Sequence, residues 1–441
     1  MAATALRAPG FEVEPLVGNY FVAAYPPFSC WQPEQLPALL GALNQPPGPT
    51  PLGVYVHVPF CQKKCDYCYY VSLIDQPAQV IDRYLSRVVE ELALYSERPA
   101  VDRRRLAFVY FGGGTPSMLT SAQIRKLASG LQGVLPWTCV PEVTSECAPR
   151  SVRREFLETL REVGVTRVSM GVQSFDDAIL KLNGRVHLRA DVLRAFAMIR
   201  EARFDRVNLD LMCGLPGETE ASWRSSIQEV IELGPESVTI YQTEIPHNTQ
   251  LYRDLKEHWA LTMPASWEVK RARLEYAFDA LDRAGYSIVS AYNAVRDPAK
   301  HEFHYQKHLW SGGDMLGLGV ASFGYMGGVH YQNQVTLENY EERLDEGSFP
   351  AWRAFALSER DRLVREFILQ LKFGHVSAID FENNFGVNIA DVFRVPLREL
   401  SAERLLTFTA SGVQLTGEGL LKVDRLLPRF YDRQFCGLRY T

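Results

Sequence analysis

Apolar, β-rich runs alternate with amphipathic runs six times along the chain. The expected strands are Val54–Val58, Leu106–Phe111, Glu142–Cys147, Arg167–Val172, Val207–Met212 and Ser237–Thr243. The runs between them have helical periodicity: Ile81–Tyr95, Ala122–Leu131, Val152–Val163, Leu188–Ala202 and Trp223–Leu233. Six successive β/α units predict an α/β fold with a parallel sheet and right-handed crossovers. The sheet is expected to curve into a partial (β/α)6 barrel, and an open doubly wound sheet is the alternative.

Proline-rich sequence predicts where this repeat begins. The run Gln45-Pro-Pro-Gly-Pro-Thr-Pro51 breaks any helix and indicates a linker. We therefore expect an N-terminal extension over the barrel (residues 1–50), a barrel (residues 51–345) and a separate small domain (residues 346–441).

Unusual residues mark the carboxyl ends of the expected strands, where parallel β/α folds bind ligands. In strand order they are a cysteine-containing loop, Gly112-Gly-Gly-Thr-Pro116, Glu146, Gln173 with Ser174, Asp210 with Gly214-Leu-Pro-Gly217, and Gln242 with Thr243. The glycines can bring backbone N–H groups close to an amino or carboxylate group. Arg185 and His187 follow the fourth strand; the arginine can pair with a carboxylate, and the histidine is expected to cap a helix or lie on the surface.

Cys61, Cys65 and Cys68 have Cys-x3-Cys-x2-Cys spacing. Ferredoxin clusters use four cysteines, so three thiolates would leave one iron of a [4Fe–4S] cluster open to a small molecule. A structural zinc site is the alternative, but it needs four ligands and only His57 is nearby. The other cysteines show no pairing pattern and are expected to be small buried side chains in a reducing compartment: Cys30, Cys139, Cys147, Cys213 and Cys436.

Composition excludes several classes of protein. The formal charge is −5 and no basic run is present, so we expect neither a nucleic acid partner nor a membrane surface. No stretch is long and apolar enough for a transmembrane helix, and the first residues lack a secretory leader. These features predict a cytoplasmic enzyme.

The motifs together resemble the oxygen-independent coproporphyrinogen III oxidase-like (HemN-like) family of the radical S-adenosylmethionine (SAM) superfamily. The similar segments lie within residues 17–430: Tyr55-Val-His-Val-Pro-Phe-Cys61, Phe111-Gly-Gly-Gly-Thr-Pro-Ser117, Gly171-Val-Gln-Ser-Phe175, Asn208-Leu-Asp-Leu-Met-Cys-Gly-Leu-Pro-Gly217, Leu316-Gly-Leu-Gly-Val320 and Leu415-Thr-Gly-Glu-Gly419. The resemblance implies a TIM-type partial barrel, the radical SAM core, and a small, mainly helical, winged-helix-like C-terminal domain.

The same resemblance implies the cofactors. A [4Fe–4S] cluster on Cys61, Cys65 and Cys68 would cleave SAM to a 5′-deoxyadenosyl radical, with a second SAM beside the first and a reductase such as flavodoxin or ferredoxin as electron donor. Tyr55, Gly112 and Glu146 resemble contacts to the first SAM. The following resemble contacts to one SAM or the other: Tyr67, Gly113, Gly114, Thr115, Gln173, Arg185, Asp210, Thr243 and Phe323. No further catalytic residue is identified by the motifs.

Two departures from the family bear on the substrate. Coproporphyrinogen oxidases carry a fourth cysteine where this chain has Tyr70, and a Tyr-Thr-Ser-Tyr-Pro stretch where it has Asn19-Tyr-Phe-Val-Ala-Ala-Tyr-Pro-Pro27. We therefore expect methylation or cyclopropanation of an unsaturated small molecule. Porphyrinogen decarboxylation is one alternative.

A haem chaperone is the other alternative, with His301, His304 and His308 as candidate ligands on one face of a possible helix. A polar surface cluster would also explain these three histidines. The N-terminal aromatic residues are either substrate contacts or packing residues: Tyr20, Tyr25, Phe28 and Trp31.

Overall fold

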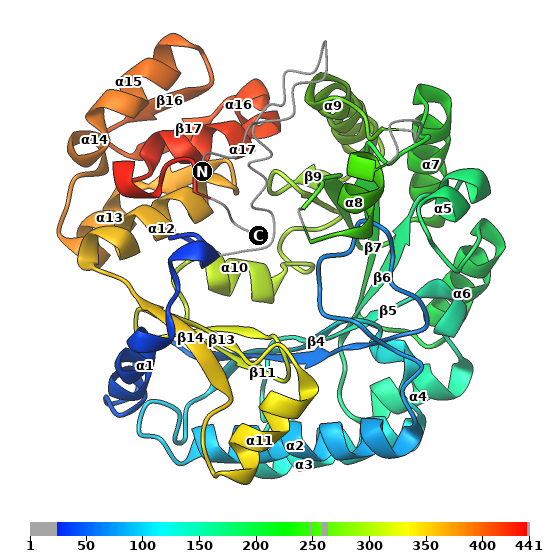
Figure 1. The fold of residues 1–441 in the computed structure, drawn as a ribbon. Coiled ribbons are helices and arrows are strands. Elements are labelled where there is room, and N and C mark those ends of the chain that lie inside the picture. The colour runs from blue at the N-terminus through cyan, green and yellow to red at the C-terminus, as the bar shows by residue number, and fades with distance from the viewer. Residues whose placement is uncertain (1–23, 247, 258–262, 439–441) are drawn as a thin grey trace.

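One large mixed sheet organises the computed structural model, which describes residues 24–246, 248–257 and 263–438 (Figure 1). Its strand order is β14-β13-β12-β11-β1-β4-β5-β6-β7-β8-β10-β9. The parallel centre consists of β1 (Leu52–Val58), β4 (Leu106–Gly113), β5 (Val143–Cys147), β6 (Arg167–Gln173), β7 (Arg206–Cys213) and β8 (Ser237–Gln242). All six predicted strands are confirmed. Because β14 and β9 are edges, the described sheet is an open, partial barrel.

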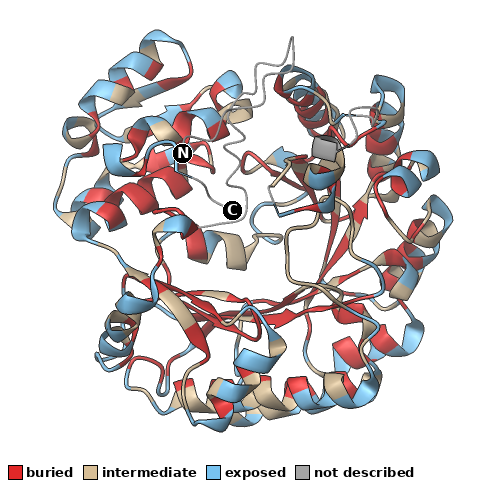
Figure 2. Cartoon of the chain, viewed as in Figure 1, coloured by how far each residue is buried: buried red, intermediate tan, exposed pale blue. Residues whose placement is uncertain are grey.

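Helices cover the outer face of the curved sheet (Figure 1). They are α2 (Ala78–Ser96), α3 (Ser121–Val134), α4 (Arg154–Glu162), α5 (Asp177–Leu182), α6 (Arg189–Glu201), α7 (Glu220–Leu233) and α9 (Trp267–Arg283). Helix α8 (Gln250–Glu257) lies instead beside the cysteine loop, where Leu251 N–H donates to Asp66 O at 2.7 Å. Local chemistry sets their ends: Thr120 and Gln123 form a capping box at the start of α3, and Gly234 ends α7 in the left-handed conformation. Figure 2 shows buried residues along the sheet and on the helix faces toward it.

Short strands extend the sheet beyond the predicted six. On one side β11 (Met315–Leu318) pairs parallel to β1, and β12 (Phe323–Met326), β13 (Val329–Asn333) and β14 (Ala351–Ala356) continue antiparallel. On the other side are β10 (Asn293–Val295) and β9 (Ser287–Ile288). Helix α10 (His304–Trp310) lies inside the curve of the sheet, and α11 (Leu337–Asp345) packs beside α2. A small parallel pair, β2 (Phe60–Cys61) and β3 (Leu73–Ile74), brackets the cysteine loop.

The C-terminal part is mainly helical, as predicted. It contains α12 (Glu359–Leu371), α13 (Ala378–Phe385), α14 (Ile389–Val392), α15 (Arg394–Ala402), α16 (Gly417–Leu421) and α17 (Val423–Leu426). A three-stranded antiparallel sheet accompanies them: β15 (His375–Ser377), β17 (Gly412–Leu415) and β16 (Leu406–Thr409). The division at residue 346 stays a prediction; β14, which follows it, belongs to the main sheet.

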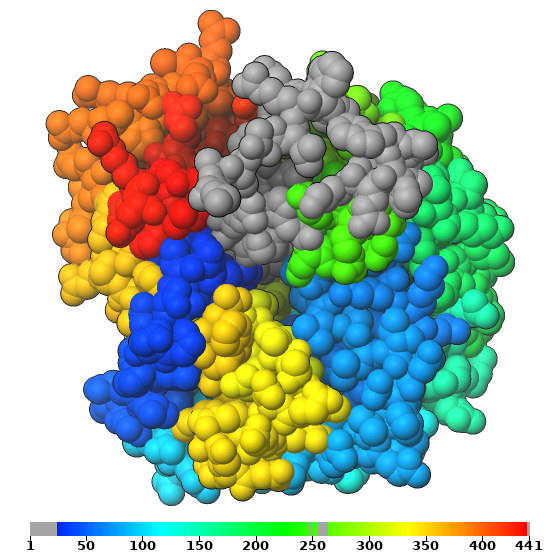
Figure 3. Space-filling model, viewed as in Figure 1, coloured from blue at the N-terminus to red at the C-terminus, as the bar shows by residue number. Residues whose placement is uncertain are grey.

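The N-terminal segment joins these parts. Its helix α1 (Leu36–Leu43) packs on β13 and β14, and Gln32 forms a bridge with Ala354. Tyr25 packs 4.9 Å from the ring of Tyr431, and its hydroxyl accepts a hydrogen bond from the backbone of Asp432. Figure 3 shows this blue segment lying against the red C-terminal residues. Within the described residues, no helix is long and apolar enough to cross a membrane.

Candidate active site

The cysteine loop and the carboxyl ends of β4–β8 enclose a cavity of about 280 Å³, called here the cysteine cavity. It is lined by the three motif cysteines and by eight of the residues predicted as SAM contacts: Tyr67, Gly113, Gly114, Thr115, Glu146, Gln173, Arg185 and Asp210. These side chains come from five strand ends, so the parallel topology brings them together as the strand-end rule predicts.

The three motif cysteines line one wall of the cysteine cavity. Thr115 Oγ1 lies 3.6 Å from Cys61 Sγ, and Arg185 Nη1 lies 3.0 Å from Cys65 Sγ. No described group of three or more His, Cys, Asp or Glu residues is arranged to hold one metal ion. Burial raises the pKa of the Cys68 thiol to about 11, so the protein alone does not make it a reactive thiolate. Three cysteines suit a [4Fe–4S] centre with one open iron, and they are one ligand short of a structural zinc site.

Arg185 is held by a buried histidine. His187 Nε2 donates to the Val172 carbonyl at 3.0 Å, which leaves Nδ1 to accept from Arg185 Nη2 at 3.2 Å. Desolvation lowers the pKa of His187 to about 3, so the ring stays neutral. The same Arg185 nitrogen also donates to Gly171 O at 2.9 Å. The expectation that His187 caps a helix or lies on the surface is therefore wrong; it orients the guanidinium beside Cys65.

The glycine turn after β4 is built for close approach. Gly113 has φ +109°, and a Cβ atom on Gly114 would stand 2.8 Å from backbone atoms of Val58, Pro59 and Phe60. The turn thus packs directly on the strand that leads into the cysteine loop. It presents backbone N–H groups, one of which, Gly113 N–H, donates to Glu146 Oε2 at 3.1 Å.

Two carboxyl groups lie in the cavity wall. Glu146 accepts from the Tyr110 hydroxyl at 2.8 Å, and desolvation raises its pKa to about 7. Asp210 accepts from Ser169 and Asn208, both at 2.9 Å, and desolvation also raises its pKa. Both groups can exchange such bonds for those of ligand hydroxyl or amino groups.

Tyr55 and Phe323 lie in a neighbouring pocket, called here the aromatic pocket. Its lining includes Phe28, Trp31, Tyr55, His57, Tyr305, Phe323, Tyr325, His330 and Arg365. Tyr69 and Tyr70 line both this pocket and the cysteine cavity. Gly112 lines neither, but a Cβ atom there would stand 2.8 Å from Tyr110 and 3.0 Å from Glu146.

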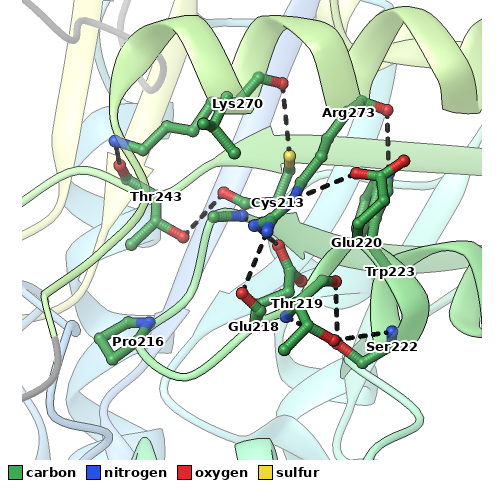
Figure 4. Close-up of polar contacts among 12 residues, drawn as sticks. Cys213, Pro216, Glu218, Thr219, Glu220, Ser222, Trp223, Thr243, Lys270 and Arg273 are labelled. Atoms are coloured by element: carbon green, nitrogen blue, oxygen red, sulfur yellow. Dashed lines mark hydrogen bonds and ion pairs between the residues drawn. The ribbon is translucent and has the colours of Figure 1, made fainter.

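Thr243 does not line the cysteine cavity. Its hydroxyl donates to Cys213 O at 2.9 Å, and its own carbonyl accepts from Lys270 Nζ at 2.6 Å (Figure 4). Gln242 and Glu244, on either side of it, do line the cavity. Side chains alternate along an extended chain, so the Thr243 side chain points away from the cysteine cavity. The position of this side chain therefore does not support the prediction that Thr243 contacts SAM.

The remaining candidates divide. Phe28 and Trp31 line the aromatic pocket, Tyr25 packs against the C-terminal part, and Tyr20 lies outside the described residues.

The three histidines proposed as haem ligands do not share one helix face. Helix α10 begins at His304, so His301 is not on it, and His308 Nε2 donates to Asp314 O at 2.8 Å. Cys139 and Cys436 are exposed, contrary to the expectation of burial.

Several cavity residues were not foreseen. Tyr110 lies two residues before Gly112 on the same strand, so strand alternation could have identified it. Arg167 is the first residue of β6 and reaches the cavity only because its side chain is long. Tyr241 and Glu244 also line the cavity and were missed.

Families and individual proteins of similar sequence are consistent with a cluster site at the three cysteines. The radical SAM superfamily model matches residues 55–230, and the HemN C-terminal domain model matches residues 357–421. The heme chaperone HemW of Bacillus subtilis is 30% identical over 381 residues, covering 85% of this chain and 98% of that protein. The oxygen-independent coproporphyrinogen III oxidase of Salmonella typhimurium is 29% identical over 407 residues, covering 87% and 86%.

A solved structure shows the same fold. The coproporphyrinogen III oxidase (HemN) of Escherichia coli, described as a radical SAM enzyme, superposes with a TM-score of 0.81 at 26% identity, covering 93% of this chain and 96% of that one. The protein therefore belongs to the radical SAM superfamily and, within it, to the HemN-like family that contains coproporphyrinogen III oxidases and HemW heme chaperones.

Proposed function

We propose that this protein uses two SAM molecules to methylate or cyclopropanate an unsaturated small molecule. The chemistry that a [4Fe–4S] cluster with SAM supplies in this superfamily is one-electron reductive cleavage of the sulfonium, followed by hydrogen abstraction. The protein supplies binding, orientation and exclusion of water.

The residues of the cysteine cavity have distinct tasks in this proposal. Cys61, Cys65 and Cys68 would hold the cluster, and Arg185 places a guanidinium N–H 3.0 Å from Cys65 Sγ. Further residues bind the ligand: the glycine turn through its backbone N–H groups, and Glu146 and Asp210 through hydrogen bonds to hydroxyl or amino groups.

The observation that carries the proposal of two SAM molecules is the pair of adjoining pockets. Residues that resemble SAM contacts are distributed over both: eight line the cysteine cavity, whereas Tyr55 and Phe323 line the aromatic pocket. A single SAM chelating the cluster accounts for the first group. Tyr55, which resembles a contact to the first SAM, lies where the aromatic pocket adjoins this cavity, and a second SAM in contact with the aromatic pocket would account for Phe323.

Tyr70 favours methyl transfer over porphyrinogen decarboxylation. It stacks on Tyr69 with ring centres 4.5 Å apart, and burial raises its pKa well above 10. A neutral aromatic ring thus occupies the place of the fourth cysteine of the oxidases. If the protein is a methyl-transfer enzyme, which also departs from the oxidases in its N-terminal stretch, Tyr70→Cys alone should not create coproporphyrinogen oxidase activity; a gain of that activity would contradict the proposal.

Oxidative decarboxylation of a porphyrinogen is the second candidate, because the relatives include named coproporphyrinogen oxidases at 29% identity. A heme-binding role is the third, on the strength of the HemW relatives. In each enzymatic case we propose a small-molecule substrate, and flavodoxin or ferredoxin as electron donor. The cytoplasmic location stays a prediction.

The test uses protein reconstituted with iron and sulfide under anaerobic conditions, then given dithionite and SAM. Cysteine-dependent 5′-deoxyadenosine together with S-adenosylhomocysteine, both absent from a Cys65→Ala control, would support the proposal. 5′-Deoxyadenosine alone, with consumption of added coproporphyrinogen III, would favour the oxidase. Neither product from a fully loaded cluster, with a Soret shift on haem titration, would favour the chaperone.

A further inference from the structure

A second cavity, of about 400 Å³, lies at the opposite end of the barrel from the cysteine cavity. Its lining includes Arg167 and Ser237, the first residues of β6 and β8. Parallel strands place these positions at the amino-terminal edge of the sheet, away from the edge that carries the cluster ligands. Further walls come from α10 and from the C-terminal part, through residues such as Gln306 and Gln370. We call this space the basal cavity.

Arg167 and Phe303 form the partition between the two cavities, because both residues line both spaces. The guanidinium carbon of Arg167 lies 4.0 Å from the centre of the Phe303 ring, which is cation–π contact. A ligand in the basal cavity would therefore touch the floor of the cysteine cavity.

Arg167 is a buried cation that forms no direct ion pair with any described residue. Its exposed fraction is 3%, and its Nη1 atom has no hydrogen-bond partner among residues 24–246, 248–257 and 263–438. Its charge lowers the pKa of both Glu146 and Asp210, yet no described ion pair joins it to either. A buried charge is costly unless it is paired and hydrogen-bonded. An anion is the ligand that would satisfy it.

Asn293 adds a second, independent requirement. It is 3% exposed, and its Nδ2 donates to Gln306 Oε1 at 2.6 Å. Its Oδ1 atom is buried and meets no hydrogen-bond donor in the described part of the chain. Because Asn293 also lines the basal cavity, a ligand with an O–H or N–H group would complete it.

Among the described ionisable groups that line the basal cavity, Arg167 is the one that carries a buried charge without an ion-pair partner. Lys307 and Glu302 pair with each other at 2.5 Å. His375 and Asp380 are exposed, and desolvation lowers the pKa of His301. The interior of the basal cavity is thus positive where it meets the cysteine cavity.

We propose that the basal cavity binds a small organic acid. Arg167 holds its carboxylate, and Asn293 Oδ1 accepts from a hydroxyl or amino group on it. Since Arg167 and Phe303 also border the cysteine cavity, the bound acid would lie against the floor of the site proposed for SAM, and that last step rests on the proposed function.

The test compares two ligands that differ only in charge. Calorimetric titration of the anaerobically reconstituted protein with 3-bromo-4-hydroxybenzoate and with 3-bromo-4-hydroxybenzamide should show the acid binding about tenfold more tightly, as expected for a charge-assisted hydrogen bond. Arg167→Met should abolish the preference. Lys307→Met, a cation of the same cavity that is paired with Glu302, should retain it.

Equal binding of acid and amide by the wild-type protein would overturn the proposal even if Arg167→Met failed to fold. The bromine allows the site to be located by anomalous diffraction: a peak beside Arg167 is expected, and a peak only elsewhere would overturn the assignment. Binding is measured without SAM cleavage, so the two proposals fail separately. Absence of cleavage with the acid preference intact would contradict only the proposed function.

Discussion

At the scale of single residues, Gly114 tests how closely the glycine turn must approach the cysteine loop. In Gly114→Ala the new Cβ would stand 2.8 Å from backbone atoms that cannot move without displacing the loop. We expect a loss of about 1–3 kcal/mol in the free energy of unfolding, as for overpacking elsewhere, and fewer irons bound per chain after reconstitution. Gly133→Ala on α3 is the matched control, since no described residue lies within 4 Å of its Cβ position, and it should stabilise the protein by up to about 1 kcal/mol.

Glu146 provides a pH-dependent prediction. Burial raises its pKa from 4.5 to about 7, so between these values the folded protein holds a proton that the unfolded chain has lost. The free energy of unfolding must therefore fall as the pH rises through this window. Glu146→Gln removes the effect: relative to the wild type, its stability should rise by up to about 3 kcal/mol between pH 4.5 and about pH 8. Urea unfolding of both metal-free proteins measures this, and a constant difference at all pH values would contradict it.

At the scale of elements, the buried Glu91 ties α2 to the added strands. Its carboxylate accepts from Tyr340 Oη at 2.6 Å, Gly319 N at 2.7 Å and Asn333 Nδ2 at 2.6 Å. In Glu91→Gln an amide N–H₂ would face one or more of these donors, at a cost of about 1–3 kcal/mol. Glu90→Gln is the control on the same helix, because Glu90 is 52% exposed and pairs with the surface residue Arg87; its effect should stay below about 1 kcal/mol. Equal losses in the two variants, measured by urea unfolding, would show that the buried network contributes nothing specific.

The same scale shows what the sequence could predict of the fold. Strands β1 and β4 are largely apolar runs buried on both faces, and their pattern is plain. Strands β9 and β10 are two and three residues long, too short for a periodic signal. Strand β11 was missed because Gly317, where a Cβ would meet the Phe323 carbonyl carbon at 2.4 Å, makes a packed strand look like a loop.

For the candidate site, the strand-end rule brought most of the right residues together but could not fix where each side chain points. Thr243 shows this limit. Gln242 and Glu244 line the cysteine cavity, whereas Thr243 between them is hydrogen-bonded to Cys213 and Lys270. Arg167 shows a second limit of the strand-end rule. It is the first residue of its strand, and it reaches the cysteine cavity only because its side chain is long. Both outcomes depend on three-dimensional packing that no local pattern encodes.

At the scale of the whole molecule, three distant parts of the chain meet at the aromatic pocket. Phe28 of the N-terminal segment stacks on Phe323 of β12 with ring centres 4.5 Å apart, Tyr55 comes from β1, and Arg365 comes from α12. The pocket therefore exists only when the N-terminal segment, the barrel and the C-terminal part are assembled. Its occupant should depend on that assembly, whereas the cysteine cavity, built from the barrel alone, should not.

This arrangement predicts the stoichiometry of SAM binding. Anaerobic equilibrium dialysis of the reconstituted protein should give two SAM molecules per chain. Phe323→Ala removes one wall of the aromatic pocket and its stacking on Phe28. The affinity of the second site for SAM should fall by about tenfold, comparable to the loss of about 1–3 kcal/mol for a base–aromatic stack. The first site should still bind one molecule. Val335→Ala, at a position 41% exposed, should leave both sites unchanged. A single site in the wild-type protein, or loss of both sites in Phe323→Ala with the cluster intact, would contradict the division of the two SAM molecules between the two pockets.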